Sequence, residues 1–464
     1  MKGFVIAGTK SGCGKTTVTL GFLAALTRRG LRAAPFKVGP DFIDPGHHTR
    51  IAGNQSRNLD GWMLSRDYNL QCFYGRLADT DVAVVEGVMG LFDGYDGKTE
   101  VGSTAQMAKW LGLPVILVVD AASMARSAAA VVMGFEHFDP RLHYAGVIFN
   151  NLGSRRHLQY LREGVREKIK MPCLGGITRN PDLAMPERHL GLVTREDYPL
   201  GRDTVERLAD LIEENIDLDL LLDSLSEINL PVRSEEPVKP REKTVRIAVA
   251  RDNAFCFYYP DNLELLETHG AEIVTFSPMV NNPLPHDIDG IYLGGGYPEL
   301  FAEKLAGNYS MREGIKAQSR SGMPIYGECG GFMYLCEELI DPKGRCYPMA
   351  GCFPFAVKMF PRLKALGYRE ITLNRNTVIG NTGLTIRGHE FHYSEMSRLS
   401  SEVKTAYRIA DRTGMEKPPD GYVVENTLGS YNHLHFGSQP EAAAQFVNNC
   451  LKYRRRKGKI HATR

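Results

Sequence analysis

The sequence lacks any apolar run long enough to cross a membrane. Its longest strongly apolar stretch, LPVILVV, is far shorter than the roughly 20 residues that a spanning helix needs. The N-terminal segment MKGFVIAGTKSGCGKTT also lacks the long apolar core and the small-residue cleavage site of a signal peptide. The nine cysteines are odd in number, and none forms a CxxC pair or a His/Cys cluster with metal-ligand spacing. Free thiols in a reducing compartment explain them best, so we expect a cytoplasmic protein without a membrane partner.

The chain also lacks an excess of charge of either sign. It has 56 Lys and Arg against 54 Asp and Glu, a net charge of +2. Its last residues, KYRRRKGKIHATR, are rich in Lys and Arg and contain no acid, so the rest of the chain is slightly acidic. This distribution argues against a DNA-binding surface built into the fold, and we expect no nucleic-acid partner. The segment 451–464 is expected to be a basic tail that frays in solvent.

What the 464 residues do contain is an alternation of short β-branched runs and amphipathic stretches. In the first half the expected strands are FVIA, RAAPFKV, DVAVVE, PVILVVD and YAGVIFN, with helices such as TTVTLGFLAALTRRG and TAQMAKWLG between them. This pattern predicts an α/β fold with a parallel sheet covered by helices. A stretch rich in proline and charge then interrupts the pattern, and the alternation restarts with VRIAVA. We therefore predict a domain over 1–230, a linker over 231–244 and a second α/β domain over 245–450, with a β-rich part from about 350 to 430.

A glycine-rich turn, GTKSGCGKTT, follows the first expected strand and precedes a long helical pattern. Glycines at positions such as Gly12 and Gly14 let backbone N–H groups approach phosphates. Lys15 would reach the β- and γ-phosphates of ATP, and Thr16, next to Thr17, would offer its hydroxyl to Mg²⁺. The order of strand, loop and helix predicts a nucleotide site that uses ATP and Mg²⁺.

The form GTxxxxGKT resembles the dethiobiotin synthetase branch of the P-loop enzymes. Lys10 stands where partition-type ATPases of the same superfamily carry an extra lysine. The resemblance implies that Glu86, after the strand DVAVV, helps to hold the metal. Asn150, at the end of VIFN, can pair with donor and acceptor edges of adenine, although asparagine is also a common turn residue.

Two further segments carry acidic residues near the expected phosphate site. FKVGPDFIDPGHH contains Lys37, Asp41, Asp44 and His47, which we expect on an irregular loop after a strand. EGVMGLFDGYDG contributes Asp93 in another glycine-rich loop. Carboxylates placed there can bind Mg²⁺ or position a substrate, although Asp-Pro and Gly-Pro pairs also suit a plain turn.

The segment MPIYGECGGFMYL predicts a second site, a nucleophile elbow. Cys329 lies between a strand and a helix and has small neighbours, which allow a strained turn. The helix N-terminus is expected to favour the thiolate, and the N–H group of Gly330 can face an oxyanion. Other cysteines, such as Cys336 and Cys352, are expected to be buried as small apolar side chains.

A base for this thiol is expected in GSYNHLHFGS near the end of the chain. The pattern is similar to the His-x-Glu pair of triad-type (class I) glutamine amidotransferases, with His433 matching the base and His435 in the place of the acid; the two roles could also be exchanged. The same resemblance implies that Gly296 in GGGYPE supplies the other half of the oxyanion hole. In RGHEFHYSE, His389 and His392 are expected on opposite faces of a strand, which argues against a metal site.

Taken in order, GTKSGCGKTT, KVGPDFIDPGHH, VEGVMGLFDG, YLGGGYPEL, GECGGFMYL, GHEFHYSE and SYNHLHF resemble the cobyrinic acid a,c-diamide synthase family from end to end. The resemblance implies a P-loop ATP-binding amidoligase domain followed by a class I glutamine amidotransferase-like domain. It further implies that Asp41, Asp44 and Asp93 serve carboxylate activation. The expected substrates are ATP, L-glutamine and a tetrapyrrole carboxylate, in cobalamin biosynthesis.

The sequence leaves the macrocycle open among cobyrinate, hydrogenobyrinate and nickel sirohydrochlorin, and it leaves the oligomeric state open. A partition-type switch ATPase is a remote alternative, because it explains only the first 230 residues and leaves Cys329 and His433 without a role.

Overall fold

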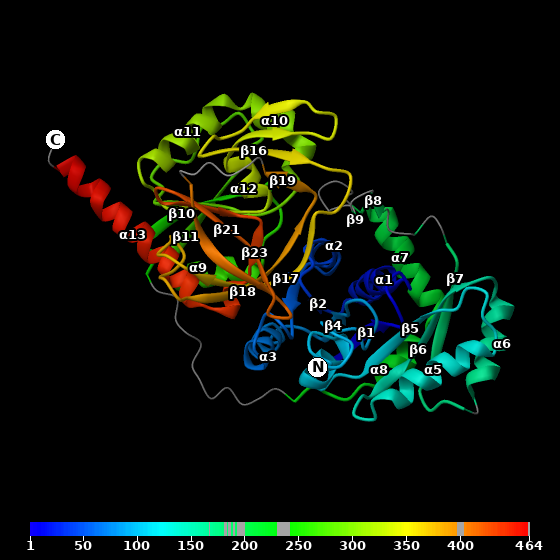
Figure 1. The fold of residues 1–464 in the computed structure, drawn as a ribbon. Helices are drawn as coiled ribbons and strands as arrows, with labels where there is room; N and C mark the ends of the chain where they lie inside the picture. The colour runs from blue at the N-terminus through cyan, green and yellow to red at the C-terminus, as the bar shows by residue number, and fades with distance from the viewer. Residues whose placement is uncertain are drawn as a thin grey trace. The chain divides into compact units, whose positions relative to one another are not determined.

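A computed structural model of the chain describes residues 1–166, 168–180, 183, 187–188, 191–192, 200–229, 242–396 and 403–462. The chain divides into two compact units, Met1–Arg233 and Ser234–Arg464, whose elements are drawn in Figure 1. Of the predicted linker 231–244, the positions before 242 lie outside the described residues. No helix in the described part of the chain is long and apolar enough to cross a membrane.

The first unit is built on a seven-stranded sheet with the order β3-β2-β4-β1-β5-β6-β7. Every neighbouring pair in it is parallel, as the alternating pattern predicted. The strands are β1 (Lys2–Gly8), β2 (Ala33–Val38), β3 (Arg57–Leu59), β4 (Val82–Glu86), β5 (Val115–Asp120), β6 (Tyr144–Leu152) and β7 (Cys173–Thr178), and a short pair, β8 (Glu187–Arg188) and β9 (Gly191–Leu192), stands apart.

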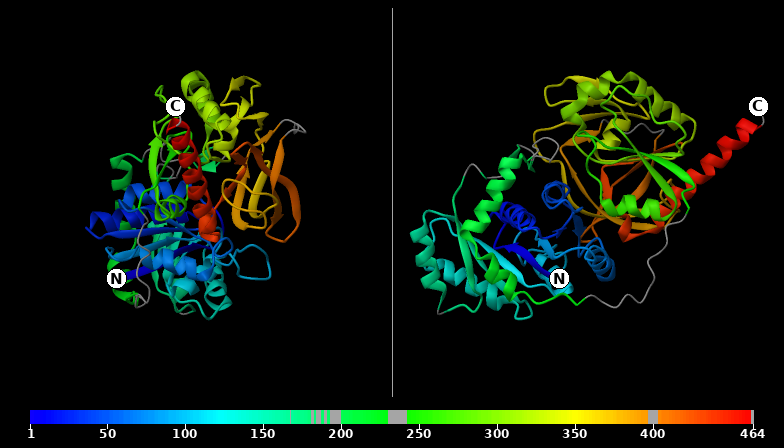
Figure 2. Two further views of the ribbon diagram at one scale, coloured as in Figure 1. Left: turned by 90° about the vertical axis from the view of Figure 1, so that its left-hand side faces the viewer. Right: turned by 180° about the vertical axis from the view of Figure 1, so that it is seen from behind.

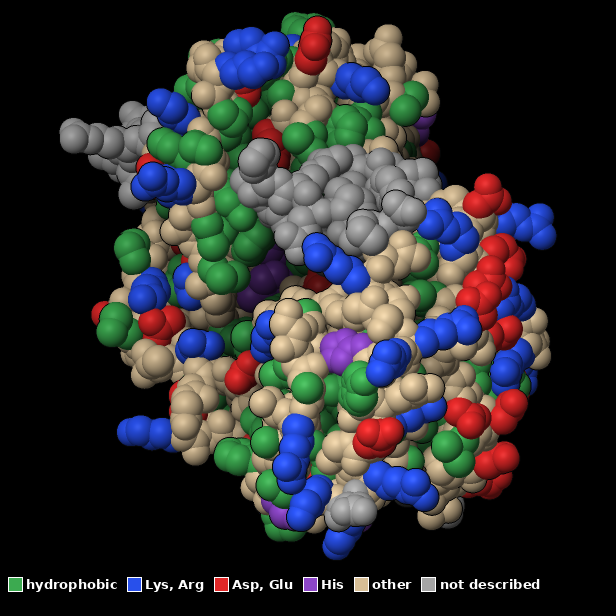
Figure 3. All heavy atoms as spheres, turned by 90° about the vertical axis from the view of Figure 1, so that its right-hand side faces the viewer, with side chains coloured by type: hydrophobic (Ala, Val, Ile, Leu, Met, Phe, Trp, Pro, Cys, Tyr) green, Lys and Arg blue, Asp and Glu red, His purple; other side chains and the backbone are tan. Residues whose placement is uncertain are grey.

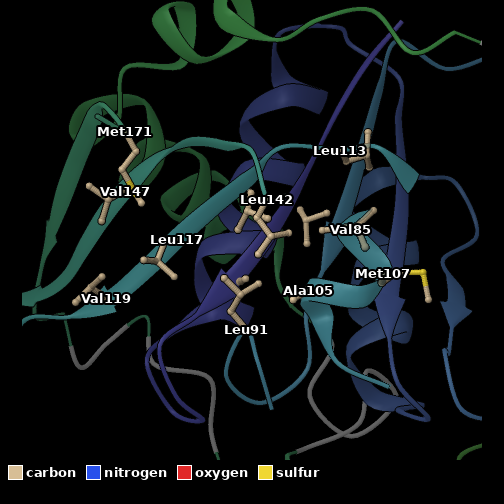
Figure 4. Packing of buried hydrophobic residues seen from close by; sticks show 14 of the residues in the cluster. Val85, Leu91, Ala105, Met107, Leu113, Leu117, Val119, Leu142, Val147 and Met171 are labelled. Carbon is tan, nitrogen blue, oxygen red and sulfur yellow. The ribbon is translucent and has the colours of Figure 1, made fainter. Parts of the chain in front are cut away.

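Helices cover both faces of this sheet, which is why its strands read as continuous apolar runs. Successive residues of β1 alternate between two buried clusters: Val5 and Ala7 belong to one, Phe4 and Ile6 to the other. The first cluster, part of which is shown in Figure 4, also holds residues of α3 (Arg66–Gly75), α4 (Thr104–Leu111), α5 (Ser127–Phe138) and α6 (Arg155–Arg166). The second holds residues of α1 (Lys15–Arg28), α2 (Ile43–Ala52), α7 (Arg202–Asn215) and α8 (Leu218–Ser224).

The second unit has a ten-stranded sheet with the order β11-β10-β12-β13-β22-β21-β20-β17-β18-β23. Its strands are β10 (Val245–Ala250), β11 (Ala271–Phe276), β12 (Gly290–Leu293), β13 (Ile325–Glu328), β17 (Ala365–Leu373), β18 (Thr385–His392), β20 (Lys404–Asp411), β21 (Glu416–Val424), β22 (Thr427–Ser430) and β23 (Asn432–Leu434). Pairs from β11 to β22 are parallel, and the remaining pairs are antiparallel. This matches the predicted α/β pattern with a β-rich part after about residue 350.

Smaller elements complete the second unit. A four-stranded sheet joins β14 (Cys336–Ile340), β15 (Cys346–Pro348), β16 (Phe353–Met359) and β19 (Ser394–Met396). The helices are α9 (Pro260–Thr268), α10 (Ala302–Gly307), α11 (Tyr309–Arg320), α12 (Gly330–Leu335) and α13 (Glu441–Ala462), with short 3₁₀ turns η2 (Pro298–Phe301) and η3 (Phe436–Ser438).

The C-terminal basic segment differs from the expected frayed tail. It continues α13 as a helix to Ala462, and Figures 1 and 2 show this helix extending beyond the sheets of its own unit. Two of its arginines are fixed to backbone carbonyls, Arg454 to Thr244 O at 2.8 Å and Arg456 to Ser321 O at 3.0 Å. On the face drawn in Figure 3, Lys and Arg side chains are intermingled with Asp and Glu, in keeping with the nearly neutral composition.

Candidate active sites

The glycine-rich loop lies where the sequence predicted it, between the end of β1 and the start of α1. Gly14 caps the helix with φ +97°, a left-handed conformation that favours glycine. A Cβ atom there would lie 2.0 Å from Asn150 Nδ2, so the close approach of these two residues also requires glycine. Asn150 Nδ2 donates to Cys13 O at 2.9 Å, which ties the end of β6 to the loop.

A cavity of about 530 Å³ opens beside this loop. It brings together most of the predicted nucleotide residues: its lining includes Gly12, Gly14, Lys15, Thr16, Thr17 and Asn150. The lining also includes Glu86, predicted to hold the metal, Asp41, predicted to serve carboxylate activation, and Lys37. Lys10 is not part of the lining. Its side chain is 64% exposed, and its ammonium lies 3.1 Å from Asp120 Oδ2.

Charged side chains at the back of the cavity form a compact cluster around Lys37. Lys37 Nζ donates to Asp44 Oδ2 at 2.6 Å and to Glu86 Oε1 at 2.8 Å. Glu86 Oε1 also accepts from Thr16 Oγ1 at 2.8 Å, and Glu86 Oε2 is hydrogen-bonded to His48 Nε2 at 2.7 Å. The cluster therefore joins the first turn of α1 to the ends of β2 and β4 and to α2.

The expectation of one irregular loop for these residues was wrong. Lys37 lies in β2, and Asp44 and His47 lie in α2, so only Asp41 stays in the connection. Asp41 Oδ1 accepts the backbone N–H groups of Ile43, at 2.7 Å, and Asp44, at 3.4 Å, and so caps the start of α2. These two hydrogen bonds favour a helix start at Ile43, two residues after Asp41.

Burial and neighbouring charges shift the pKa values of Glu86 and Asp44 in opposite directions. Burial alone would raise the pKa of Glu86, but the charge of Lys37 and the hydrogen bond from His48 hold that pKa below its ordinary value. Burial and the charges of Asp41 and Glu86 raise the pKa of Asp44 well above its usual range. Asp44 Oδ1 is buried and accepts no hydrogen bond from the described residues. One ammonium thus faces three carboxyl groups: Lys37 holds Glu86 in its ionised form, whereas the raised pKa of Asp44 favours its neutral form.

The donor set fits Mg²⁺. Thr16 Oγ1 and Glu86 Oε1 lie 2.8 Å apart, close to the roughly 2.9 Å between adjacent oxygens around an octahedral ion with 2.0–2.1 Å bonds. In the described part of the chain no group of three or more His, Cys, Asp and Glu side chains is arranged to hold a metal.

Asp93 lies apart from the cavity lining, in the loop after β4. Its Oδ2 accepts the N–H group of Gly90 at 2.8 Å, so it shapes the loop that carries Met89. Met89 has φ +47°, a strained value for a residue other than glycine, and its carbonyl accepts from Lys15 Nζ. The loop of Asp93 is therefore hydrogen-bonded to Lys15 through the Met89 carbonyl.

The strand–turn–helix geometry predicted around Cys329 is present between β13 and α12. Cys329 has φ +46° and ψ −105°, the strained turn expected for such an elbow, and it is 6% exposed. Its backbone N–H donates to Ser430 O at 2.7 Å, which anchors the turn on β22. Cys336 and Cys352 are buried, as expected.

Gly330 and Gly296, the predicted oxyanion residues, are neighbours. A Cβ atom on Gly330 would lie 3.0 Å from Gly296 N, so the two backbones approach more closely than a side chain allows. The strand end before η2 and the start of α12 therefore meet beside the thiol.

The two predicted histidines, His433 and His435, are both buried, but their side chains contact different groups. His433, in β23, lies against Gly295: a Cβ atom there would be 2.2 Å from His433 Cε1. His389 is paired with His433 across β18 and β23, and their rings stack with centroids 4.9 Å apart. The His435 ring instead packs on the Tyr259 ring, with the ring centroids 4.4 Å apart, and its Nδ1 accepts a hydrogen bond from Gly437 N.

The thiol and the imidazole have pKa values that favour their neutral forms. Burial raises the pKa of Cys329, and the charge of Glu299 adds to this. The N–H group of Gly330 at the start of α12 lowers this pKa and so favours the thiolate, as expected, but burial outweighs it. Burial lowers the pKa of His433 to about 3, so the ring is an uncharged proton acceptor.

Two residues of these sites were missed from the sequence. His48, the neighbour of the named His47, is the ring that contacts Glu86. Glu328 precedes Cys329, is 2% exposed, and accepts hydrogen bonds from Tyr326 Oη at 2.6 Å and Leu434 N at 2.9 Å. The sequence could have indicated Glu328, because it is an acidic residue at the end of the buried strand IYGE.

Comparison with known proteins defines the class of protein. The family described as "CobQ/CobB/MinD/ParA nucleotide binding domain" matches residues 4–193, and the "CobB/CobQ-like glutamine amidotransferase domain" matches residues 246–441. A nucleotide-binding domain and a glutamine amidotransferase domain in one chain define a ligase that uses ATP and glutamine.

Curated relatives define the family. "Cobyrinate a,c-diamide synthase" of Dehalococcoides mccartyi (strain CBDB1) is 42% identical over 96% of this chain and 97% of its own length. The proteins of the same name from Syntrophotalea carbinolica and Salmonella typhimurium are each 44% identical, over 96% and 94% of this chain and 98% and 96% of their own. The chain belongs to the cobyrinate a,c-diamide synthase family, as the motifs implied.

Proposed function

We propose that the chain amidates the a- and c-acetate carboxylates of cobyrinate, with ATP and glutamine as cosubstrates, in cobalamin biosynthesis. The proposal rests on one observation: a single chain holds a phosphate-loop cavity with a carboxylate cluster and a cysteine elbow with a neutral histidine, and its relatives share both units over nearly their whole length. Hydrogenobyrinate and nickel sirohydrochlorin are alternative substrates for the same chemistry.

At the nucleotide site a substrate carboxylate oxygen would attack the γ-phosphorus of ATP, which gives an acyl phosphate and ADP. Gly12, Gly14, Lys15 and Thr17 would bind the phosphates, with Asn150 and Lys10 near the nucleotide. Thr16 and Glu86 would hold Mg²⁺, which supplies charge neutralisation to the phosphates when bound. Asp41, Asp44 and Asp93 would place and activate the substrate carboxylate.

At the second site the Cys329 thiol would give its proton to His433 and attack the side-chain amide carbon of glutamine. Gly296 and Gly330 would donate N–H groups to the oxyanion. Ammonia leaves with the proton from His433, and water hydrolyses the glutamyl thioester to glutamate. The ammonia then attacks the acyl phosphate, and the products are the amide and phosphate.

The test separates the two sites. Cys329→Ala and His433→Ala should lose glutamine-dependent amidation almost entirely and keep most of the rate with high concentrations of free ammonia, whereas His435→Ala should lose less. If Cys329→Ala still uses glutamine well, the elbow is only a structural turn. If ammonia fails to rescue a folded Cys329→Ala protein, the thiol also acts in amide synthesis and the two-site scheme is wrong.

The substrate is tested by competition. Cobyrinate, hydrogenobyrinate and nickel sirohydrochlorin are offered together with ATP and glutamine, and the products are identified by mass spectrometry. The proposal predicts two amidations of cobyrinate ahead of the others, and ATP hydrolysis that depends on the added tetrapyrrole.

A further inference from the structure

The thiol and its base are carried by strands that are not neighbours in the sheet. Cys329 follows β13, and His433 lies in β23, at the end of the sheet order. The order runs from β13 through β22, β21, β20, β17 and β18 before it reaches β23. Backbone pairing fixes β23 to β18, and it fixes the elbow to Ser430, which ends β22 two residues before β23 begins. No backbone hydrogen bond that the structure records joins β13 to the described residues of β23 itself.

A side chain of the elbow strand reaches β23 itself. Glu328 Oε1 accepts the N–H group of Leu434 at 2.9 Å, and Leu434 is the residue between the two histidines. The same oxygen accepts from Tyr326 Oη at 2.6 Å, and Oε2 accepts from Tyr292 Oη at 3.0 Å. With three donors and 2% exposure, the carboxylate has a single well-defined position.

The carbonyl of the same residue, Leu434, is also held by a side chain. Asn262 of α9 donates to Leu434 O at 2.7 Å and accepts from Phe436 N at 2.7 Å. The backbone that carries His433 and His435 is thus fixed by Glu328 and Asn262, and of these two Glu328 is the one adjacent to the nucleophile.

We propose that Glu328 is a positioning residue for glutamine hydrolysis, which holds the histidine strand at the distance from Cys329 that proton transfer requires. The proposal rests on the function proposed above for Cys329 and His433. In the His-x-His pattern, His435 stands where the His-x-Glu pair has a carboxylate that orients the base. Glu328 would supply part of that orienting function from the elbow strand.

Hydrogen bonding, rather than charge, is the basis of this role. A negative charge on Glu328 raises the pKa of the neighbouring thiol and so opposes thiolate formation. Any contribution of Glu328 to glutamine hydrolysis must therefore come from its hydrogen bond to Leu434 N, which fixes the position of the histidine strand. A displacement of about 1 Å between reacting groups can lower a rate by about 10²-fold, so a loosened histidine strand is sufficient to impair catalysis.

Two conservative variants separate position from charge. Glu328→Gln removes the charge but keeps an oxygen at the same reach, and its amide can donate to Tyr292 Oη. Glu328→Asp keeps the charge but withdraws the oxygen from Leu434 N by one methylene. We expect Glu328→Gln to keep glutamine-dependent kcat within about threefold, and Glu328→Asp to lose at least about tenfold with little change in the KM for glutamine.

Ammonia-dependent amidation by both variants should match that of the unaltered protein, and Glu337→Ala, which removes an exposed carboxylate on β14, is the matched control. An Asp variant as active as the Gln variant, or an ammonia-dependent rate that falls in parallel, overturns the proposal. Cys329→Ala is assayed alongside. If it still uses glutamine, the proposed function itself has failed; if it does not and Glu328→Asp is fully active, only the inference about Glu328 has failed.

Discussion

Lys37 Nζ lies 2.8 Å from Glu86 Oε1, and the two residues are direct partners across the parallel strands β2 and β4. Both are almost fully buried, with Lys37 5% and Glu86 0% exposed. Burial alone would lower the pKa of Lys37, but the charges of Asp44 and Glu86 outweigh it and raise that pKa above its ordinary value. The lysine is therefore a fixed positive charge at the back of the nucleotide cavity.

Removing this charge should destabilise the first unit. Lys37→Met leaves buried carboxylates without their partner, and breaking such a pair typically costs about 3–5 kcal/mol. Both tryptophans, Trp62 and Trp110, lie in the first unit, so their fluorescence during urea unfolding reports on that unit. Arg32→Met, which breaks an exposed pair with Asp81, is the control and should leave the transition nearly unchanged. Equal midpoints for the two variants would contradict the role given to Lys37.

ATP binding and carboxylate activation should respond differently to mutation. Asp44 and Asp93 do not line the nucleotide cavity, so Asp44→Asn and Asp93→Asn should keep their affinity for ATP while amidation falls. Lys15→Ala, which removes a lining cation, should lose affinity and about 10²-fold or more in amide synthesis. ATP titration of each variant by calorimetry provides the measurement. A large loss of ATP affinity in either Asn variant would reassign that residue to the phosphate site.

Local pattern was sufficient to predict the parallel sheet, the phosphate loop and the elbow. In each case a run of apolar residues ends at a glycine-rich turn, and that signal depends only on neighbours in the sequence. The strained backbone of Cys329 followed from the same reasoning, because small neighbours allow such a turn. The place of Gly296 beside Gly330 was instead implied by the family resemblance.

Strand order could not be predicted in this way. Lys37 meets Glu86 because β4 lies between β2 and β1, and the sequence contains no local signal for that insertion. The choice of His48 over its neighbour His47 depends on the rotation of α2, and the high pKa of Cys329 depends on how completely the fold buries it. These are tertiary effects, so motif spacing does not reveal them.

Gly295 should be as important for glutamine use as the residues that touch glutamine. Its missing side chain leaves room for the His433 ring, and a Cβ atom would lie 2.2 Å from His433 Cε1. Gly295→Ala should therefore displace the ring and lower glutamine-dependent amidation by about 10²-fold, with the ammonia-dependent rate retained. Gly307→Ala adds the same methyl group in α10, where nothing lies within 4 Å, and should leave both rates unchanged. Full glutamine-dependent activity in Gly295→Ala would show that His433 is not held at this position.

Glu328 should give the second unit a stability that depends on pH. Burial raises the pKa of this carboxyl from 4.5 to about 7, although Tyr326, Leu434 and Tyr292 donate hydrogen bonds to it. The folded state therefore binds a proton more tightly than the unfolded state does, so between about pH 4.5 and 7 the folded carboxyl is protonated while the unfolded one is ionised. This contribution to stability is fully present below pH 4.5, falls as the pH rises toward 7, and is lost above it.

Glu328→Gln cannot ionise, so it should lack this fall. The difference in unfolding free energy between Glu328→Gln and the unaltered protein should grow in favour of the variant by on the order of 3 kcal/mol from pH 4.5 to pH 8, at 1.36 kcal/mol for each unit of pKa shift. Scanning calorimetry of both proteins across this range measures the difference, and other titrating groups cancel because they are shared. Glu337→Gln, at an exposed carboxyl of the same unit, should show no such divergence. If the stability of Glu328→Gln follows that of the unaltered protein across the whole range, then the carboxyl titrates at its ordinary pKa and the fold does not hold it as a buried acid.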